Sequence, residues 1–228
     1  MNSLTASPVA DVLNRLFKDA EEVDRPIMEQ FIGAGAATMD EVWTQMLQEE
    51  RKEYRKVYEG FRNNYLSINP QLGRFLYMLA RTRRAKRIVE FGTSFGISTI
   101  YLACALRDNG GGRLIGTELE PAKAQRAEEN LKAAGLADLV EIRVGDALET
   151  LQHLDAPIDL VLLDGAITLY LPVLKLVEPH LTPGAMVVGE NAVKQSPPYL
   201  DYVRDPRNGY LSLPLAFRDG NELSLRTE

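Results

Sequence analysis

The sequence predicts an α/β fold in which helices cover both faces of a mainly parallel sheet. One observation behind this is the alternation of short apolar runs with helical stretches from residue 87 onward. The other is an apolar run, Ile88 to Phe91, that stops at Gly92 and precedes Gly96 and a helical pattern from Ser98 to Leu106. A buried strand, a tight glycine turn and a helix start follow one another there, which is typical of a ligand site.

Composition narrows the class of protein. The chain has 228 residues, enough for one α/β domain with an added helical part. Its formal net charge of −6 argues against a general nucleic-acid-binding protein. Its single cysteine, Cys104, leaves no internal disulfide, and no apolar run approaches the ~20 residues of a membrane span. We therefore expect a cytoplasmic protein with no nucleic-acid or membrane partner.

The chain divides into a predicted helical cap or lid at residues 1–65 and an α/β domain at 66–228. The cap contains a long, highly charged helix predicted at 39–62. This helix is either an ordinary surface helix or a lid or dimer helix over an active site.

The remaining elements follow from turn signals and periodicity. An amphipathic helix is expected after Ser7-Pro8 and should end at Pro26; a loop or close packing point is expected at 33–36, a polar break at 63–73 and a helix at 74–83. Strands are expected at 87–92, 114–119, 140–145, 158–164, 185–190, 210–216 and 222–226. The last two form a predicted antiparallel hairpin, because Asp219-Gly220 is a strong turn signal.

Carboxylates accompany the ends of the five parallel strands, where ligands bind in open α/β sheets. They are Glu90, Glu118, Asp146, Asp164 and Glu190. Glu118 is placed to accept hydrogen bonds from a ribose diol, the alternative being a helix cap before Pro121. Asp146 either accepts from an adenine amino group or caps the helix that begins at Ala147.

The glycine spacing separates two kinds of nucleotide ligand. A dinucleotide site requires Gly-x-Gly-x-x-Gly, whereas this chain has Glu-x-Gly-x-x-x-Gly-x-Ser from Glu90 to Ser98. The wider loop favours a nucleoside that carries an amino-acid tail over a pyrophosphate.

The segment from Val89 to Ser98 resembles the first motif of class I S-adenosylmethionine-dependent methyltransferases, and more narrowly the catechol and caffeoyl-coenzyme-A O-methyltransferases. The likeness runs from about Asn69 to the C-terminus and includes GTELEP at 116–121, DLVLLD at 159–164 and LTPGA at 181–185. It implies a seven-stranded sheet in the order 3-2-1-4-5-7-6. It also implies a homodimer and methyl transfer from S-adenosylmethionine to a small aromatic or hydroxylated acceptor.

The resemblance assigns roles to individual residues. The cofactor would contact Glu90, Gly92, Thr93, Ser94, Gly96 and Ser98 near its methionine end, Glu118 at its ribose, Asp146 and Ala147 at its adenine, and Asp164. The divalent-metal ligands would be Asp164, Glu190 and Asn191, with Asp164 and Glu190 also acting in catalysis. Two carboxylates and an amide oxygen suit Mg²⁺ or Ca²⁺.

Two positions depart from the family. Glu190 stands where the family has aspartate, which moves the ligand oxygen outward by roughly 1.5 Å. Three outcomes stay open for metal binding: it survives, it weakens, or it favours a more tolerant ion such as Ca²⁺. Ile167 stands where the family has its lysine base, leaving Lys175, Lys194 and Glu190 as base candidates. Three functions therefore stay open: metal-assisted O-methyl transfer, metal-independent transfer of a methyl or other group from the same cofactor, and cofactor binding without catalysis.

Overall fold

The centre of the molecule is a seven-stranded sheet. The computed structural model describes residues 2–33, 35–215 and 220–228. The strands are β1 (Arg87–Phe91), β2 (Arg113–Glu118), β3 (Val140–Val144), β4 (Ile158–Leu163), β5 (Leu181–Gly189), β6 (Tyr210–Leu215) and β7 (Asn221–Arg226). Their order is β3-β2-β1-β4-β5-β7-β6, as the family resemblance implied. Strands β1 to β5 are parallel, and β7 pairs antiparallel with both β5 and β6.

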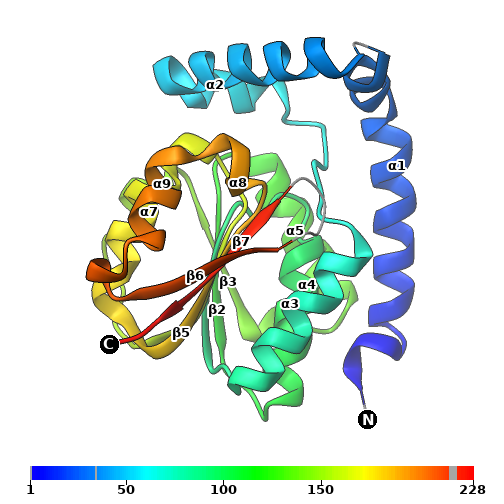
Figure 1. Cartoon of the computed structure of the whole chain (residues 1–228). Coiled ribbons are helices and arrows are strands. Elements are labelled where there is room, and N and C mark those ends of the chain that lie inside the picture. Colours follow the sequence, from blue (N-terminus) through cyan, green and yellow to red (C-terminus); the bar gives the residue numbers. More distant parts are fainter. Residues whose placement is uncertain (1, 34, 216–219) are drawn as a thin grey trace.

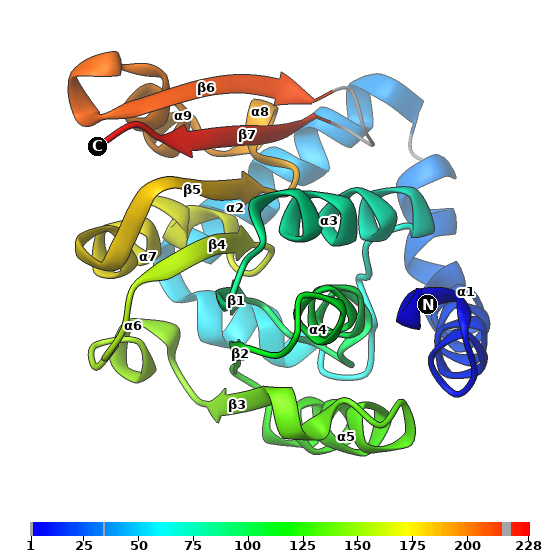
Figure 2. The ribbon, with the colours of Figure 1, turned by 90° about the horizontal axis from the view of Figure 1, so that it is seen from below.

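Helices cover both faces of this sheet, as Figure 2 shows. One face carries α3 (Pro70–Arg83), α4 (Ile97–Asp108) and α5 (Pro121–Ala133), and the other carries α6 (Ala147–Thr150), α7 (Tyr170–Val177) and α9 (Pro197–Arg204). The short elements are α8 (Ala192–Gln195) and the 3-10 turns Ser3–Thr5, Ala137–Leu139, Ile167–Leu169, Glu178–His180 and Pro206–Asn208. The predicted α/β class is confirmed.

Burial on both faces explains why the β1 sequence is apolar without alternation. Ile88 packs into the cluster formed with α3 and α4, whereas Val89 and Phe91 pack into the cluster on the α7 face. Successive side chains of a strand point to opposite faces, so a strand covered on both sides needs apolar residues at successive positions. Cys104 lies fully buried in the first cluster and packs there as an apolar side chain.

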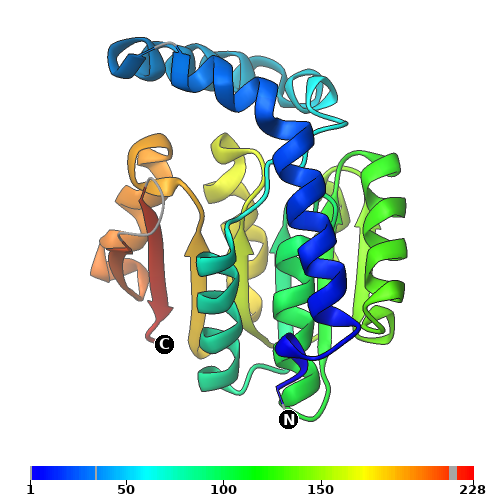
Figure 3. The ribbon, with the colours of Figure 1, turned by 90° about the vertical axis from the view of Figure 1, so that its right-hand side faces the viewer.

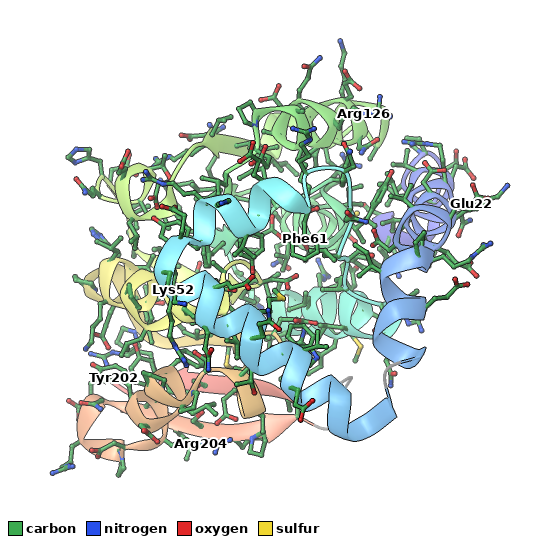
Figure 4. The ribbon with its side chains drawn as sticks, turned by 90° about the horizontal axis from the view of Figure 1, so that it is seen from above. Glu22, Lys52, Phe61, Arg126, Tyr202 and Arg204 are labelled. Carbon is green, nitrogen blue, oxygen red and sulfur yellow. The ribbon has the colours of Figure 1, made fainter. Side chains whose placement is uncertain are left out.

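Two long helices precede the α/β body. Helix α1 (Val9–Gly33) runs along its side, and α2 (Gly35–Gly60) crosses over one end of it (Figures 1 and 3). Figure 4 looks down on that end and shows α2 passing across the ribbon, with Lys52 labelled on it and Phe61, which follows its last residue, labelled as well. In the described part of the chain, no helix combines the length and apolar character that crossing a membrane requires.

Several predicted boundaries were wrong. Pro26 does not end the first helix, because α1 continues to Gly33; a proline removes one backbone hydrogen bond and can be carried inside a helix. The predicted break at 63–73 is shorter, because Asn69 caps α3 by accepting from the Leu72 amide at 2.8 Å. The charged helix starts at Gly35 rather than 39, and β5 starts at Leu181 rather than 185.

Two predicted turns fall partly outside the described residues. The loop or close packing point predicted at 33–36 includes residue 34, and the predicted hairpin turn includes 216–219; these residues lie outside the described ones. The hairpin strands themselves pair as predicted, with Leu215 opposite Asn221.

The strand register lines up the residues that follow the strands. Phe91 of β1 lies opposite Thr117 of β2 and Leu163 of β4, and Leu163 lies opposite Gly189 of β5. The next residues therefore form one row along the carboxyl edge of the sheet: Glu118, Gly92, Asp164 and Glu190. Backbone pairing places these four residues together although they lie far apart in the sequence.

Candidate active site

The turn after β1 is a tight loop that requires glycine. Gly92 has φ +97°, and a Cβ atom there would overlap the carbonyl of Asp164. The amides of Gly92 and Thr93 donate to the Thr117 carbonyl at 3.2 and 3.0 Å, which ties the loop to β2. Gly96, with φ +88°, directly precedes α4. The predicted strand, glycine turn and helix start are therefore present, and the loop brings bare backbone beside the first amides of α4.

A cavity lies over this loop, and we call it the glycine-loop cavity. Eight of the predicted cofactor residues line it: Gly92, Thr93, Ser94, Ser98, Glu118, Asp146, Ala147 and Asp164. Tyr54 and Tyr58 of α2 also line it. Of the predicted residues, Glu90 and Gly96 belong to the loop and its support rather than to the described wall.

Glu90 is fully buried and supports the loop from within. Its Oε2 atom accepts from Thr93 Oγ1 at 3.1 Å and from Thr99 Oγ1 at 2.5 Å. Its Oε1 atom has no hydrogen-bond partner within the described residues. Burial raises the pKa of Glu90 to about 7, against hydrogen bonds from Thr99, Ser98 and Thr93 that lower it. The unpartnered oxygen leaves Glu90 able to accept one more donor.

Glu118 holds the far side of the glycine loop. Its Oε2 atom accepts from the Ser94 amide at 2.7 Å, and its Oε1 atom accepts from the Glu120 amide at 2.9 Å. Burial raises the pKa of Glu118, while the backbone bond from Glu120 and the charge of Lys123 lower it. Each carboxylate oxygen has a second lone pair, so Glu118 can still accept from a ligand hydroxyl in the cavity.

Asp146 caps α6 and also binds α2. Its Oδ1 atom accepts from the Leu148 amide at 2.9 Å, which is the capping arrangement weighed from the sequence. Its Oδ2 atom accepts from the Tyr54 hydroxyl and from Arg55 Nη2, the latter at 2.6 Å. Burial alone would raise the pKa of Asp146, but the hydrogen bonds from Tyr54 and Arg55 outweigh it and lower the pKa. Asp146 therefore fastens α2 to the rim of the glycine-loop cavity.

A second cavity, the helix-walled cavity, lies between the N-terminal helices and the carboxyl edge of β4 and β5. Its apolar wall includes Phe17 and Ile27 of α1 and Trp43, Met46 and Phe61, which lie in or just beyond α2. The three predicted metal-ligand residues, Asp164, Glu190 and Asn191, line its opposite side. Asp164 and Gly165 line both cavities, so the two meet there.

The donor set at this edge fits a hard divalent cation. Asp164 and Glu190 supply carboxylates, and the Oδ1 atom of Asn191 is buried with no hydrogen-bond partner in the described structure. The Asn191 amide donates to Asn221 Oδ1 at 2.8 Å, which fixes its backbone at φ 54°. Among the described residues, no cluster of three or more histidine, cysteine, aspartate or glutamate side chains is placed to hold a metal. Any cation here would need the amide oxygen as well as the two carboxylates.

The candidate bases named from the sequence lie in different parts of the molecule, and not all of them are near the cavities. Ile167 is buried and lines the helix-walled cavity, where its side chain offers no proton acceptor. Lys175 lies on α7, bonded to Glu178 at 3.0 Å and over the Tyr202 ring at 3.5 Å, so it serves a separate structural network. The side chain of Lys194 lies outside the described part of the structure. Glu190 remains at the cavity, with its backbone carbonyl accepting from the Tyr170 hydroxyl at 2.9 Å.

Sequence reasoning missed two residues of α2 at this site. Glu50 is 0% exposed, and its Oε1 atom accepts from the Thr168 amide at 2.7 Å. The Tyr58 hydroxyl lies 3.3 Å from Glu50 Oε2 and 3.4 Å from the Gly165 carbonyl oxygen. Burial raises the pKa of both side chains. A signal was present, because residues 50, 54 and 58 follow a four-residue spacing that places polar groups on one helix face.

The sequence of this chain is similar to those of known methyltransferases. The methyltransferase-domain family matches residues 89–192. A catechol O-methyltransferase from Niastella koreensis is 36% identical over 133 residues, covering 57% of this chain and 59% of that protein. One from Mycobacterium tuberculosis is 43% identical over 101 residues, covering 44% of this chain and 45% of that protein. The chain thus aligns with about half the length of these two curated relatives.

A solved structure extends the likeness. The O-methyltransferase TomG from Streptomyces achromogenes, solved in complex with S-adenosylmethionine, superposes with a TM-score of 0.66 at 28% identity, covering 82% of this chain and 89% of that one. Residues 89–192 therefore match a methyltransferase domain, and the chain has the fold of class I methyltransferases. The matched residues of the domain run from β1 to the start of α8 and so include the glycine loop, the row of strand-end residues and Asn191.

Proposed function

We propose that this protein transfers a methyl group from S-adenosylmethionine to a hydroxyl oxygen of a small aromatic acceptor. The observation that carries the proposal is the meeting of two cavities at Asp164 and Gly165. S-adenosylmethionine would occupy the glycine-loop cavity and the acceptor would occupy the helix-walled cavity. The reaction needs mainly alignment of oxygen and methyl, because the leaving thioether is neutral. The O-methyltransferase names of the relatives support an oxygen nucleophile.

The walls of the glycine-loop cavity suit this cofactor. Glu118 has lone pairs left to accept from a ribose diol. Glu90 is buried beneath the loop rather than in the cavity wall, and its unpartnered oxygen would be the acceptor for an ammonium group bound against the loop. The start of α4 offers backbone amides to a carboxylate. Asp146 and Ala147 would lie beside the adenine, with Asp146 already engaged by Tyr54 and Arg55.

We propose Mg²⁺ or Ca²⁺ as the partner of Asp164, Glu190 and Asn191. A bound cation would lower the pKa of a coordinated acceptor hydroxyl. The apolar wall opposite would hold the aromatic part of the acceptor and exclude water. Ca²⁺ tolerates irregular oxygen geometry better than Mg²⁺, which matters because Glu190 is longer than the aspartate of the family.

A metal-independent route is the second candidate. Ile167 removes the lysine base of the family. The phenol Tyr58 lines both cavities, and its hydroxyl lies 3.3 Å from the buried carboxylate of Glu50. Both routes require the Asp164 edge, but only the first requires a chelatable cation.

We further propose that residues 1–65 form a cap or lid, because α2 binds the strand-end loops at Asp146, Gly165 and Thr168. The homodimer and the cytoplasmic location stay predictions from the sequence.

Two measurements test the function. Mass spectrometry should detect monomethylated product when the protein is incubated with S-adenosylmethionine, catechol and Mg²⁺, and Asp164→Ala should abolish it.

Calorimetric titration of Mg²⁺ and Ca²⁺ into protein saturated with S-adenosylhomocysteine should show binding that is lost in Asp164→Ala and kept in Asp155→Asn, whose carboxylate is 87% exposed. Product without metal binding would favour the metal-independent route. Binding of S-adenosylhomocysteine with no product on phenols or catechols would sink the proposed reaction.

A further inference from the structure

The Tyr58 hydroxyl belongs to the place where the two cavities meet. Six residues line both cavities: Tyr58, Leu66, Ser67, Ile68, Asp164 and Gly165. The attacking oxygen and the sulfonium methyl must come together at this junction. Tyr58 is the phenol among those six residues, so an acceptor bound at this junction would lie beside its side chain.

The hydrogen bonds of Tyr58 are long. Its oxygen lies 3.3 Å from Glu50 Oε2 and 3.4 Å from the Gly165 carbonyl, whereas O–H···O bonds usually measure about 2.7–2.8 Å. A phenol has one proton and can donate it to only one of these acceptors at a time. The hydroxyl is therefore loosely held, and its lone pairs can accept from a hydroxyl placed in the cavity.

Glu50 is a buried carboxylate with one oxygen anchored and the other facing this phenol. The Thr168 amide fixes Oε1 at 2.7 Å, which leaves Oε2 toward Tyr58. Among the side chains that the structure describes, no lysine or arginine forms an ion pair with Glu50. Burying a carboxylate without an ion-pair partner is costly, and the charge of Arg51 offsets only part of the effect of burial on the pKa of Glu50. A role as proton acceptor would explain why the Glu50 carboxylate is buried at this position.

The contact between Glu50 and Tyr58 spans a break in α2. Eight residues of a straight α-helix rise about 12 Å, which separates such positions along the axis. Within α2, Glu53 has non-helical backbone angles, φ −157° and ψ 75°, so the helix is not straight between the two residues. The two side chains meet across this irregularity, so their contact depends on the bend in α2.

Building on the proposed O-methyl transfer, we propose that Tyr58 and Glu50 take the proton of the acceptor hydroxyl, in place of the base that Ile167 does not supply. The acceptor proton moves to Tyr58 Oη while the proton of Tyr58 moves to Glu50 Oε2. The freed oxygen pair forms the new O–CH₃ bond, and the S–CH₃ bond breaks with its electrons on sulfur. Tyr58 ends as it began, Glu50 ends protonated, and it returns the proton to water once the product has left.

The test compares two acceptors of different acidity. Methyl transfer to catechol and to 4-nitrocatechol is measured for the wild type, Glu50→Gln, Tyr58→Phe and Tyr77→Phe, with S-adenosylhomocysteine affinity measured by calorimetry. Tyr77 is a matched control, because its hydroxyl also donates to a carboxylate, Asp108 at 2.7 Å, but it lines neither cavity. The nitro group acidifies the hydroxyl, so the second acceptor depends less on a protein base.

We expect Glu50→Gln and Tyr58→Phe to lower kcat for catechol by roughly 100-fold, a usual contribution of general base catalysis, and for 4-nitrocatechol by under about 10-fold. S-adenosylhomocysteine affinity should fall by no more than about fivefold, the loss expected for one hydrogen bond of α2, and the Tyr77→Phe rates should match the wild type. Equal losses for both acceptors, no loss for either, or losses explained by weaker S-adenosylhomocysteine binding would each overturn the proton-transfer role alone. A wild type that binds S-adenosylhomocysteine but methylates neither acceptor would overturn the proposed function, and this role with it.

Discussion

The two cavities differ in how the chain builds them. The glycine-loop cavity is formed largely by residues at strand ends, and the register between β1, β2 and β4 brings them together. The helix-walled cavity takes its apolar wall from α1 and α2, whose placement no strand register controls. The repeated pattern of a strand followed by a polar residue therefore predicts the first cavity from the sequence. The second cavity depends on how two helices remote in the sequence pack against the sheet.

The two N-terminal helices also differ from each other. The first half of α1 contributes Val9, Val12, Leu13 and Leu16 to the main core beside α4. Helix α2 is held to the strand-end loops by polar contacts at Glu50, Tyr54 and Tyr58. If residues 1–65 form the proposed cap or lid, only α2 would act as the lid, because removing residues 1–60 would also remove the part of the core that α1 supplies.

The largest expected effect tests whether α1 belongs to the core. Leu16 is 0% exposed, so Leu16→Ala should lower the free energy of unfolding by about 2–5 kcal/mol through lost burial and an added cavity. Val23→Ala on the same helix is the control, because Val23 is 41% exposed and its loss should cost under about 0.5 kcal/mol. Urea unfolding measures both. A small effect of Leu16→Ala would contradict the view that α1 is part of the hydrophobic core.

An intermediate effect tests the support beneath the glycine loop. Burial raises the pKa of Glu90 from 4.5 to about 7, so between these values the folded protein binds a proton that the unfolded chain releases. The free energy of unfolding should therefore fall as pH rises through this window, by up to about 3 kcal/mol. Glu90→Gln cannot titrate and should lack this fall. Urea unfolding at about pH 5 and about pH 7.5 compares the two proteins; parallel changes would contradict the assignment.

The smallest effect tests the lid. Tyr54→Phe removes the hydroxyl that binds Asp146 at the rim of the glycine-loop cavity. One hydrogen bond is worth about 1 kcal/mol, so calorimetry should show S-adenosylhomocysteine binding roughly fivefold more weakly. Tyr202→Phe is the control, because the Tyr202 hydroxyl donates to Glu178 at 2.9 Å, away from both cavities. Unchanged affinity in Tyr54→Phe would mean that α2 does not close this cavity.

The sequence predicted where the residues on the sheet side of the candidate site lie, and their roles stay predictions. Strand periodicity and strand-end acids located Glu118, Asp164 and Glu190, and the register then placed them in one row with Gly92. For Asp146, the sequence left two roles open, and only the structure added a third, the attachment of Tyr54 and Arg55.

The helix side escaped sequence reasoning for a physical reason. Glu50 and Tyr58 have the spacing of an ordinary solvated helix face, and a charged helix gives no sign of which body it covers. The continuation of α1 beyond Pro26 was missed as well, because a single proline weakens a helix locally without deciding whether packing elsewhere sustains it.

Local rules determined the part of this protein that the sequence reveals: the glycine turn, the alternating strands and the acids that follow them depend on backbone sterics and short-range periodicity. Tertiary structure alone decided that a buried carboxylate from α2 would reach Thr168 and that the two cavities would meet beside Tyr58. Contacts between segments more than 100 residues apart leave no periodic trace in the sequence, because they depend on the docking of whole helices.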